Sequence, residues 1–157
     1  MILAVGIDII EVERIRGSFE RFGERFLSRL LRPGEIAYCL SHKYPAPHLA
    51  ARFAAKEAVS KAFGTGIGAE LGWQDIEVAR RESGQPYVIL HDGGSALFAR
   101  RSGRTLHLSL SHTQNYATAV AVLEGWEPGE EPLQVPAATQ VCRGAGESTG
   151  GTSYTTP

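Results

Sequence analysis

The spacing of hydrophobic residues changes several times along the chain, and each change marks the start of another element. Residues 2–12 are apolar with several β-branched side chains, a composition typical of a strand. From residue 13 to residue 30 the apolar positions recur every three or four residues, which predicts a helix with an interruption near Gly17 or Gly23. The clearest helical period covers residues 49–63 and ends at a glycine.

Shorter elements fill the rest of the first 124 residues. We expect a short helix at 35–42, a proline-broken loop at 42–48, strands at 73–80 and 86–90, a short helix at 93–102, and strands at 106–111 and 116–123. After Glu124 the chain is rich in Pro, Gly, Thr and Ser and has no hydrophobic period. The pattern therefore predicts one folded domain at 1–124 and a flexible tail at 125–157.

Composition narrows the class of protein. The 157 residues are 43% hydrophobic and 21% charged, and a chain of this length forms a single core without help from metals or disulfides. No apolar run approaches the roughly 18 residues that span a bilayer, and the N-terminal segment lacks the cationic flank of a signal peptide. The two cysteines, Cys39 and Cys142, form no disulfide framework. We therefore expect a cytoplasmic protein with no membrane partner.

Charge is nearly balanced overall, with 16 Lys+Arg against 17 Asp+Glu, but it is unevenly distributed. Between residues 14 and 32 there are six arginines and only two acidic residues, Glu20 and Glu24. On the predicted helix, Arg14, Arg21 and Arg25 lie in a row beside the apolar stripe. This local excess of positive charge favours an acidic partner.

Two carboxylates stand in positions that need an explanation. Asp8 lies at the end of an apolar strand, where burial is costly unless the group is paired or bound to a metal. Taken alone, Asp8 is better explained as a cap of the next segment, and Glu57 as an ion pair with Lys61 four residues later. Taken together, they are oxygen ligands of the kind that Mg²⁺ prefers. Their spacing leaves open whether they meet.

The helix at 49–63 has a polar half and a small apolar half. Alanines dominate one side, so we expect that side to pack closely against a sheet and the other to face a cleft or solvent. A turn of Gly64, Thr65 and Gly66 follows, and glycine-rich backbone after a basic helix approaches phosphates closely. A solvated basic face with a glycine cap is the alternative. The polar half is formed by Arg52, Lys56, Glu57, Ser60 and Lys61.

One further polar residue, His112, stands at the end of the strand predicted at 106–111. In isolation, a hydrogen-bonded structural histidine is the simpler interpretation. The other four histidines lack the spacing of zinc ligands, which excludes a zinc site. Cys39 is predicted to lie in the core and Cys142 in the tail.

Three segments together match a known family. They are VGIDIIEVERI at 5–15, RFAAKEAVSKAFGTGIG at 52–68 and LSLSHT at 108–113. With these segments the chain resembles holo-acyl-carrier-protein synthase, the short bacterial type of 4′-phosphopantetheinyl transferase, over residues 1–124. The resemblance implies an α+β fold in which a small antiparallel sheet packs against a long central helix. It also implies a homotrimer with active sites between subunits.

The resemblance further implies that the chain transfers 4′-phosphopantetheine from coenzyme A, its substrate, to a serine of apo acyl carrier protein in fatty acid biosynthesis. Mg²⁺ is the implied cofactor, and no nucleic acid is involved. The implied catalytic residues are Asp8, Glu57 and Lys61, with Asp8 and Glu57 as metal ligands. The implied coenzyme A contacts are Arg52, Lys56, Ser60, Lys61, Gly64, Thr65, Gly66, His112 and Thr113. The implied carrier-protein docking residues are Arg14, Arg21 and Arg25.

Two points stay open at this stage. The base that accepts the serine proton is Glu57 in the first interpretation and His112 in the second. The alternative function is a non-catalytic module that binds an acidic protein through its arginine-rich helix, and such a module would not need Asp8 or Glu57.

Overall fold

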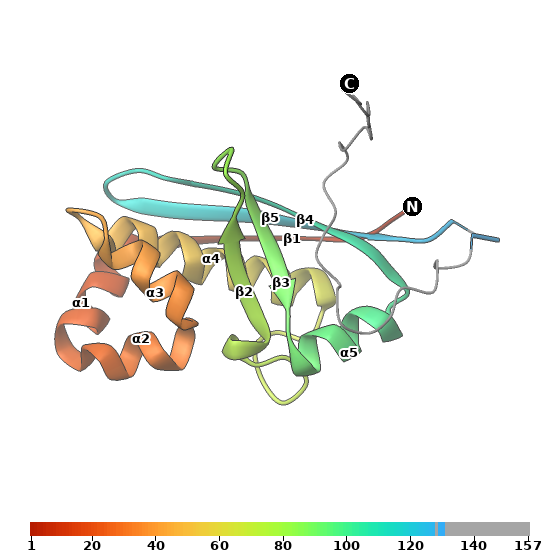
Figure 1. Cartoon of the computed structure of the whole chain (residues 1–157), viewed down its shortest axis with the longest axis horizontal. Coiled ribbons are helices and arrows are strands. Elements are labelled where there is room, and N and C mark those ends of the chain that lie inside the picture. The colour runs from red at the N-terminus through yellow and green to blue at the C-terminus, as the bar shows by residue number, and fades with distance from the viewer. Residues whose placement is uncertain (128, 131–157) are drawn as a thin grey trace, which may run out of the picture.

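The computed structural model describes residues 1–127, 129 and 130, so most of the predicted tail, including Cys142, lies outside the described residues. Strands and helices follow one another along the domain as Figure 1 shows. They are β1 (Ile2–Glu11), α1 (Val12–Phe22), α2 (Glu24–Leu30), α3 (Pro33–Leu40), α4 (Pro45–Phe63), the 3₁₀ turn η1 (Trp73–Asp75), β2 (Ile76–Arg80), β3 (Pro86–Leu90), α5 (Asp92–Arg100), β4 (Gly103–His112) and β5 (Tyr116–Gly125).

A three-stranded antiparallel sheet in the order β1-β5-β4 forms one layer of the domain. Its central strand, β5, alternates strictly, and its buried residues are mostly alanines, such as Ala117, Ala119 and Ala121. Small side chains at these positions let the helix α4 lie close to the sheet, and α4 presents Ala54, Ala58 and other small residues in return. The predicted packing of the alanine side of this helix against a sheet is confirmed.

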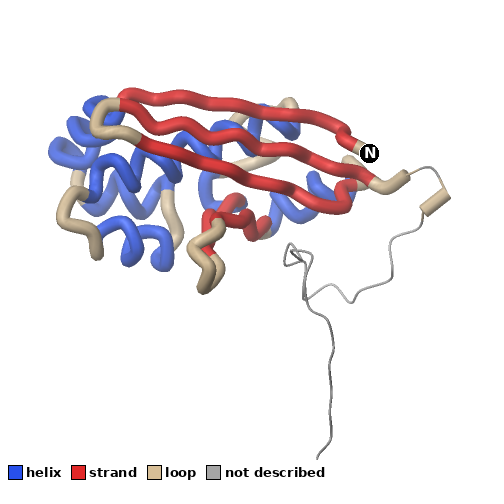
Figure 2. The backbone as a smooth tube through the Cα atoms, turned by 90° about the horizontal axis from the view of Figure 1, so that it is seen from above, coloured by secondary structure: helices blue, strands red, loops and turns tan. Residues whose placement is uncertain are grey.

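The opposite face of this sheet carries no described helix, as the view in Figure 2 shows. On β1 the outward side chains are large and apolar: Val5, Ile7 and Ile9 are 59%, 64% and 68% exposed. An apolar row of this kind on an open sheet face is unusual for a surface that meets only water.

A second, two-stranded antiparallel sheet, β2-β3, packs beside α4 on the helical side of the domain (Figure 1). Ile76, Val78 and Val88 bury its inner face in the common core. The loop after α4 and the turn η1 connect this hairpin to the helix, and β3 runs next to β4. The fold is therefore α+β, as predicted.

The structure decides one boundary that the sequence left open and differs from the expected boundaries at two other places. The predicted break in the first helix falls at Gly23, whose φ of 56° ends α1, whereas Gly17 stays inside α1. Helix α4 begins at Pro45, inside the segment predicted as a loop, because proline is tolerated in the first turn of a helix. Residues 73–75 form a 3₁₀ turn instead of the start of a strand.

Candidate active site

Strand β1 crosses α4 at Gly6, and this crossing brings Asp8 to the helix. A Cβ on Gly6 would lie 2.0 Å from the carbonyl oxygen of Ala58 and 2.5 Å from the amide nitrogen of Ala62. Only glycine allows the two backbones to approach this closely. Since side chains two residues apart share a face of a strand, Asp8 also points towards α4. The glycine and the aspartate of the GID motif thus work as a unit.

Asp8 meets α4 through Lys61. The Lys61 ammonium donates a hydrogen bond to Asp8 Oδ1 at 2.7 Å and another to the carbonyl oxygen of Ile7 at 3.1 Å. The Asp8 side chain is only 14% exposed, whereas that of Lys61 is 51% exposed. For Glu57 taken alone, the sequence suggested an ion pair with Lys61, its neighbour on the helix. The structure pairs Lys61 with the strand instead.

Glu57 lies near this ion pair and completes a site with two carboxylates. Burial raises the pKa of the Glu57 carboxyl, and the negative charge of Asp8 raises it further, while Lys61 acts in the opposite direction. Two carboxylates that lie close together repel each other, and a bound cation relieves this repulsion. Asp8 and Glu57 lie where β1 contacts α4, and that place therefore favours a cation. The carboxylate pair, Asp8 and Glu57, therefore fits Mg²⁺ by the chemistry of its donors.

The described residues contain no group of three or more His, Cys, Asp or Glu side chains that could hold a metal ion. The carboxylate pair would thus supply two protein ligands. This number is typical of Mg²⁺, which usually keeps waters and takes further oxygens from a substrate phosphate.

The glycine turn that follows α4 stands next to Lys61 in sequence and has the backbone shape expected of it. Gly64 and Gly66 have φ values of 72° and 64°, in the left-handed region. The amide of Thr65 donates to the carbonyl oxygen of Ser60, so the end of the helix is capped by its own backbone. The Thr65 hydroxyl donates to the carbonyl oxygen of Gly66.

His112 lies at the other end of α4, in a histidine cluster that we define as His42, His48 and His112. The rings of His42 and His48 stack with centroids 3.7 Å apart, and His48 meets His112 edge-on at 4.8 Å. Burial lowers the pKa of His48 to about 4, helped by the neighbouring His42 and His112. His48 is therefore neutral at physiological pH. Thr113 follows His112 in the turn to β5, where its amide donates to the carbonyl oxygen of Tyr116.

Arg52 joins this end of the site from the next turns of α4. It is 2% exposed, and its guanidinium lies 4.1 Å from the centre of the Tyr38 ring. Its Nε has no hydrogen-bond partner among the described residues. A buried cationic group with an unused donor is suited to receive an anion. Tyr38 also contacts His42 and His48, so the Arg52 guanidinium is linked to the cluster through an aromatic ring.

The expectation that the whole polar half of α4 faces a cleft or solvent is wrong. Arg52, Lys56 and Ser60 are buried. The Ser60 hydroxyl donates to the carbonyl oxygen of Glu57, and all three donors of the Lys56 ammonium are occupied inside the protein. Lys56 and Ser60 therefore offer no group to coenzyme A. Lys61 is exposed and Glu57 partly exposed.

The site thus has two parts within one chain. His48, which touches His112, lies in the first turn of α4, and Glu57 lies nine residues later on the same helix. At 1.5 Å per residue the two positions are about 14 Å apart along the axis. The carboxylate pair and the histidine cluster are consequently separate regions of the surface.

The arginine face, which we define as Arg14, Arg21 and Arg25, lies on α1 and α2. All three side chains are exposed, and within the described part of the chain none of them forms an ion pair. Phe22, beside Arg21, is 52% exposed although the helical period predicts an inward position. These two helices therefore carry three exposed guanidinium groups that have no ion-pair partner among the described residues.

Sequence reasoning missed several residues of these surroundings. No motif or regular spacing relates the residues that gather near Arg52, which are Tyr38, His42, His48 and Arg80.

Cys39 is buried as predicted, and burial raises the pKa of its thiol to about 11, which leaves it unreactive. No described helix has both the length and the hydropathy needed to cross a bilayer.

Comparison with known proteins decides the family. The model of the 4′-phosphopantetheinyl transferase superfamily matches residues 4–121. The chain belongs to this superfamily. The holo-[acyl-carrier-protein] synthase of Koribacter versatilis is 48% identical over 124 residues, which are 79% of this chain and 99% of the relative. That of Chlamydia trachomatis serovar L2 is 52% identical over 120 residues, which are 76% of this chain and 98% of the relative.

Solved structures of the same superfamily share the fold. The holo-[acyl-carrier-protein] synthase of Neisseria meningitidis superimposes with a TM-score of 0.74 at 32% identity, covering 79% of this chain and 99% of that one. The Helicobacter pylori enzyme in complex with coenzyme A gives a TM-score of 0.69 at 36% identity, covering 76% and 99%. The resemblance that rested on three motifs is therefore confirmed, and the non-catalytic alternative receives no support from these phosphopantetheinyl transferases.

Proposed function

We propose that this phosphopantetheinyl transferase moves 4′-phosphopantetheine from coenzyme A to a serine of apo acyl carrier protein, leaving adenosine 3′,5′-bisphosphate. The observation that carries the proposal is the convergence of Asp8, Glu57 and Lys61 where β1 crosses α4. These residues come from two of the three motifs. Relatives that align over nearly their whole length are named holo-[acyl-carrier-protein] synthases.

The chemistry requires charge to be neutralised around a pyrophosphate while a serine oxygen attacks the β-phosphorus. Asp8 and Glu57 would hold Mg²⁺, which supplies positive charge next to the phosphate oxygens. Lys61 offers an exposed ammonium beside them and would contact the same phosphates. Glu57 remains our first choice for the base, acting directly or through a metal-bound water, because it lies beside Asp8 and Lys61, where the phosphates would bind.

The remaining contacts to coenzyme A would come from the glycine turn and from the histidine cluster. Gly64, Thr65 and Gly66 present backbone close to Lys61. At the other end of α4, Arg52 and the turn of His112 and Thr113 would receive an anionic group of the nucleotide, since the buried guanidinium keeps one donor unused. Lys56 and Ser60 are not included, because their polar groups are already satisfied.

Acyl carrier protein would dock on the arginine face. Arg14, Arg21 and Arg25 are exposed on the two helices that follow β1 directly. Because Asp8 lies in the second half of that same strand, four residues before α1 begins, a partner bound to these helices would present its serine near the carboxylate pair. Attraction between an acidic protein and three unpaired guanidinium groups accelerates association at low salt.

We further propose that the enzyme is a homotrimer in which the uncovered sheet face meets neighbouring copies. Two observations support this assembly. The side chains of Val5, Ile7 and Ile9 form an apolar row that a neighbouring copy would cover. The two parts of the site are also separated on one chain, so that a neighbouring chain would bring a histidine cluster to each carboxylate pair. Light scattering coupled to size exclusion would measure the mass.

We assign catalysis to the predicted domain at 1–124, acting in the cytoplasm, and propose that the predicted tail at 125–157 is dispensable except for Gly125, the last residue of β5. Strand β5 ends at Gly125, and its carbonyl oxygen accepts a hydrogen bond from the N-terminal ammonium of Met1 at 2.9 Å. A truncation should therefore keep Gly125 and start after it. A chain ending there should transfer as fast as the full chain.

Incubation of the full chain with coenzyme A, Mg²⁺ and apo acyl carrier protein tests the proposed reaction. Mass spectrometry of the carrier protein should show the addition of one phosphopantetheine arm, and chelation with EDTA should abolish it. Unchanged mass with several carrier proteins that the enzyme nevertheless binds would refute the reaction and leave a binding role. Transfer that persists in EDTA would refute only the metal assignment.

A further inference from the structure

Lys56 is the most deeply buried charged side chain of the described structure, with no exposed surface. Its ammonium has three donors, and each meets an acceptor on a different element. The carbonyl oxygen of Leu30, the last residue of α2, lies at 2.7 Å, Glu35 Oε2 on α3 at 2.8 Å and the carbonyl oxygen of Trp73 in η1 at 3.0 Å. One side chain of α4 thus holds three other elements.

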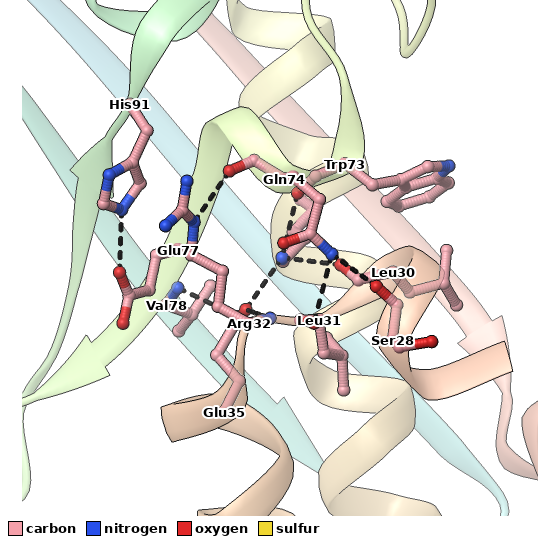
Figure 3. Close-up of polar contacts among 11 residues, drawn as sticks. Ser28, Leu30, Leu31, Arg32, Glu35, Trp73, Gln74, Glu77, Val78 and His91 are labelled. Atoms are coloured by element: carbon pink, nitrogen blue, oxygen red, sulfur yellow. Dashed lines mark hydrogen bonds and ion pairs between the residues drawn. The ribbon is translucent and has the colours of Figure 1, made fainter. Parts of the chain in front are cut away.

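Both carboxylate oxygens of Glu35 also have hydrogen-bond partners. It is 2% exposed, its Oε2 also accepts the amide of Arg32 at 2.8 Å, and its Oε1 accepts the amide of Val78 in β2 at 3.0 Å. Figure 3 shows how these partners converge. Burying two charges costs several kcal/mol for each ion, and apolar residues of the same volume are often as stable. A saturated buried pair is therefore better explained by the geometry that it imposes than by the stability that it adds.

The geometry in question is the placement of α2 and α3 against α4. Gln74 ties the turn after α2 to η1, because its Nε2 donates to the carbonyl oxygens of Ser28 at 2.8 Å and Leu31 at 3.1 Å (Figure 3). Lys56 then joins both of these segments to the middle of α4. The residue that follows Lys56 is Glu57 of the carboxylate pair.

These contacts connect two surfaces that the proposed reaction must hold in register. The arginine face includes Arg25 on α2, the helix whose last carbonyl group Lys56 binds. The carboxylate pair includes Glu57 on α4. A docked carrier protein takes its position from α1 and α2, whereas coenzyme A takes its position from α4 and the glycine turn. A displacement of about 1 Å between reacting groups costs on the order of 100-fold in rate.

We propose that Lys56 and Glu35 are positioning residues, which fix the arginine face relative to the carboxylate pair and so align the carrier-protein serine with the phosphate that it attacks. This inference rests on the proposed function. It assigns the buried pair a role in reaction geometry, in place of the coenzyme A contact expected of Lys56.

The test uses the double variant Lys56→Met with Glu35→Gln in the full chain. Methionine keeps the length of the lysine stem, and glutamine leaves no unpaired buried carboxylate while keeping an oxygen for the Val78 amide. The matched control is Val59→Ala, which removes buried volume from the same helix and leaves the hydrogen-bonding groups of Lys56 and Glu35 in place. Folding is checked by circular dichroism, and kcat and KM are expressed per folded molecule.

The expected result is a loss of about 10- to 100-fold in kcat/KM for the carrier protein, with KM for coenzyme A within about twofold of wild type. The Val59→Ala control should keep the wild-type kcat/KM for the carrier protein and the wild-type KM for coenzyme A, even where its melting temperature falls as much as that of the double variant. A double variant that folds and keeps the wild-type kcat/KM for the carrier protein would overturn the proposal. A parallel rise in KM for coenzyme A would overturn it too, because Lys56 would then serve the coenzyme A site.

Two further outcomes are decisive. Where the double variant fails to fold, Lys56→Gln with Glu35→Gln provides the test, because it also removes both charges together and gives position 56 an amide donor for the freed backbone carbonyl groups; the same selective loss for the carrier protein is expected. Equal effects on both substrates in that variant would refute positioning. A wild-type chain that transfers nothing would instead refute the proposed function, so the two failures are distinguishable.

Discussion

Replacement of Gly6 by alanine is the sharpest probe of how the fold builds the site. The new Cβ would lie 2.0 Å from the carbonyl oxygen of Ala58, whereas ordinary van der Waals contact begins near 3.4 Å. Both partners are backbone, so no side-chain rotation relieves the clash. Strand β1 and helix α4 must separate by about 1.4 Å, which is the difference between these two distances.

That separation acts directly on the Asp8–Lys61 pair. Added to the present 2.7 Å between Lys61 Nζ and Asp8 Oδ1, it gives about 4.1 Å, which is beyond hydrogen-bonding range. Overpacking of this kind costs about 1–3 kcal/mol of stability. Misplacement of catalytic groups by about 1 Å costs on the order of 100-fold in rate. We therefore expect a folded Gly6→Ala protein whose transfer rate falls by about 100-fold.

The assay is Mg²⁺-dependent modification of apo acyl carrier protein, followed by mass spectrometry, with the melting temperature measured in parallel. Gly17→Ala is the control, because a Cβ at Gly17 in α1 meets nothing within 4 Å. This change should stabilise the helix by roughly 0.5–1 kcal/mol and leave the rate unchanged. Wild-type turnover in Gly6→Ala would refute the argument that the close crossing of β1 and α4 places Asp8.

The other predictions concern charge. Glu57→Gln and Asp8→Asn should each lower the rate of transfer by at least about 100-fold without unfolding the protein. The reason is that several kcal/mol of electrostatic stabilisation of the transition state is lost. Activity retained in both variants would exclude the metal assignment. Arg14→Glu should raise KM for the carrier protein by about three- to tenfold at low salt and by less at about 0.15 M, where the Debye length is about 8 Å. Arg100→Glu, on the distant α5, is its control, and equal effects of the two would remove the docking face. For His48 the unfolded chain binds a proton near pH 6.5 but the folded chain only near pH 4. Stability is therefore full above pH 6.5 and is lost as the pH falls towards 4. Thermal melts at pH 7 and pH 5 should show a larger difference in wild type than in His48→Phe, and equal differences would contradict the lowered pKa.

Much of the fold followed from hydrophobic spacing. The strands at the two ends of the domain and the helix at α4 were predicted within a few residues, because their periods of two and 3.6 residues are a direct consequence of which face is buried. The start of α4 at Pro45 was missed, since a proline interrupts a helical pattern equally well as a breaker or as a first-turn residue.

The candidate site was predicted in part, and the reason for the missing part is physical. Three site residues lie in the sequence motifs, and their carboxylate and ammonium groups indicate the chemistry that they can perform. They are Asp8, Glu57 and Lys61. The histidine cluster joins residues 42, 48 and 112, which come from the loop after α3, from α4 and from β4 and meet only when these segments pack together. The hydrophobic period within one helix or strand contains no information about such a contact between distant segments.

Lys56 shows most clearly where the information in the sequence ends. On a helical wheel it belongs to the polar half of α4, together with Lys61, and local pattern treats the two lysines alike. Tertiary structure separates them. The exposed side chain of Lys61 binds Asp8, whereas Lys56 binds Glu35, 21 positions away, and two backbone carbonyl groups in the interior. Sequence by itself determined the elements, the family and the kinds of reactive groups, because periodicity and residue chemistry are local. Which charge is buried depends on acceptors supplied by distant segments, and that was decided only when α2, α3 and η1 packed around α4.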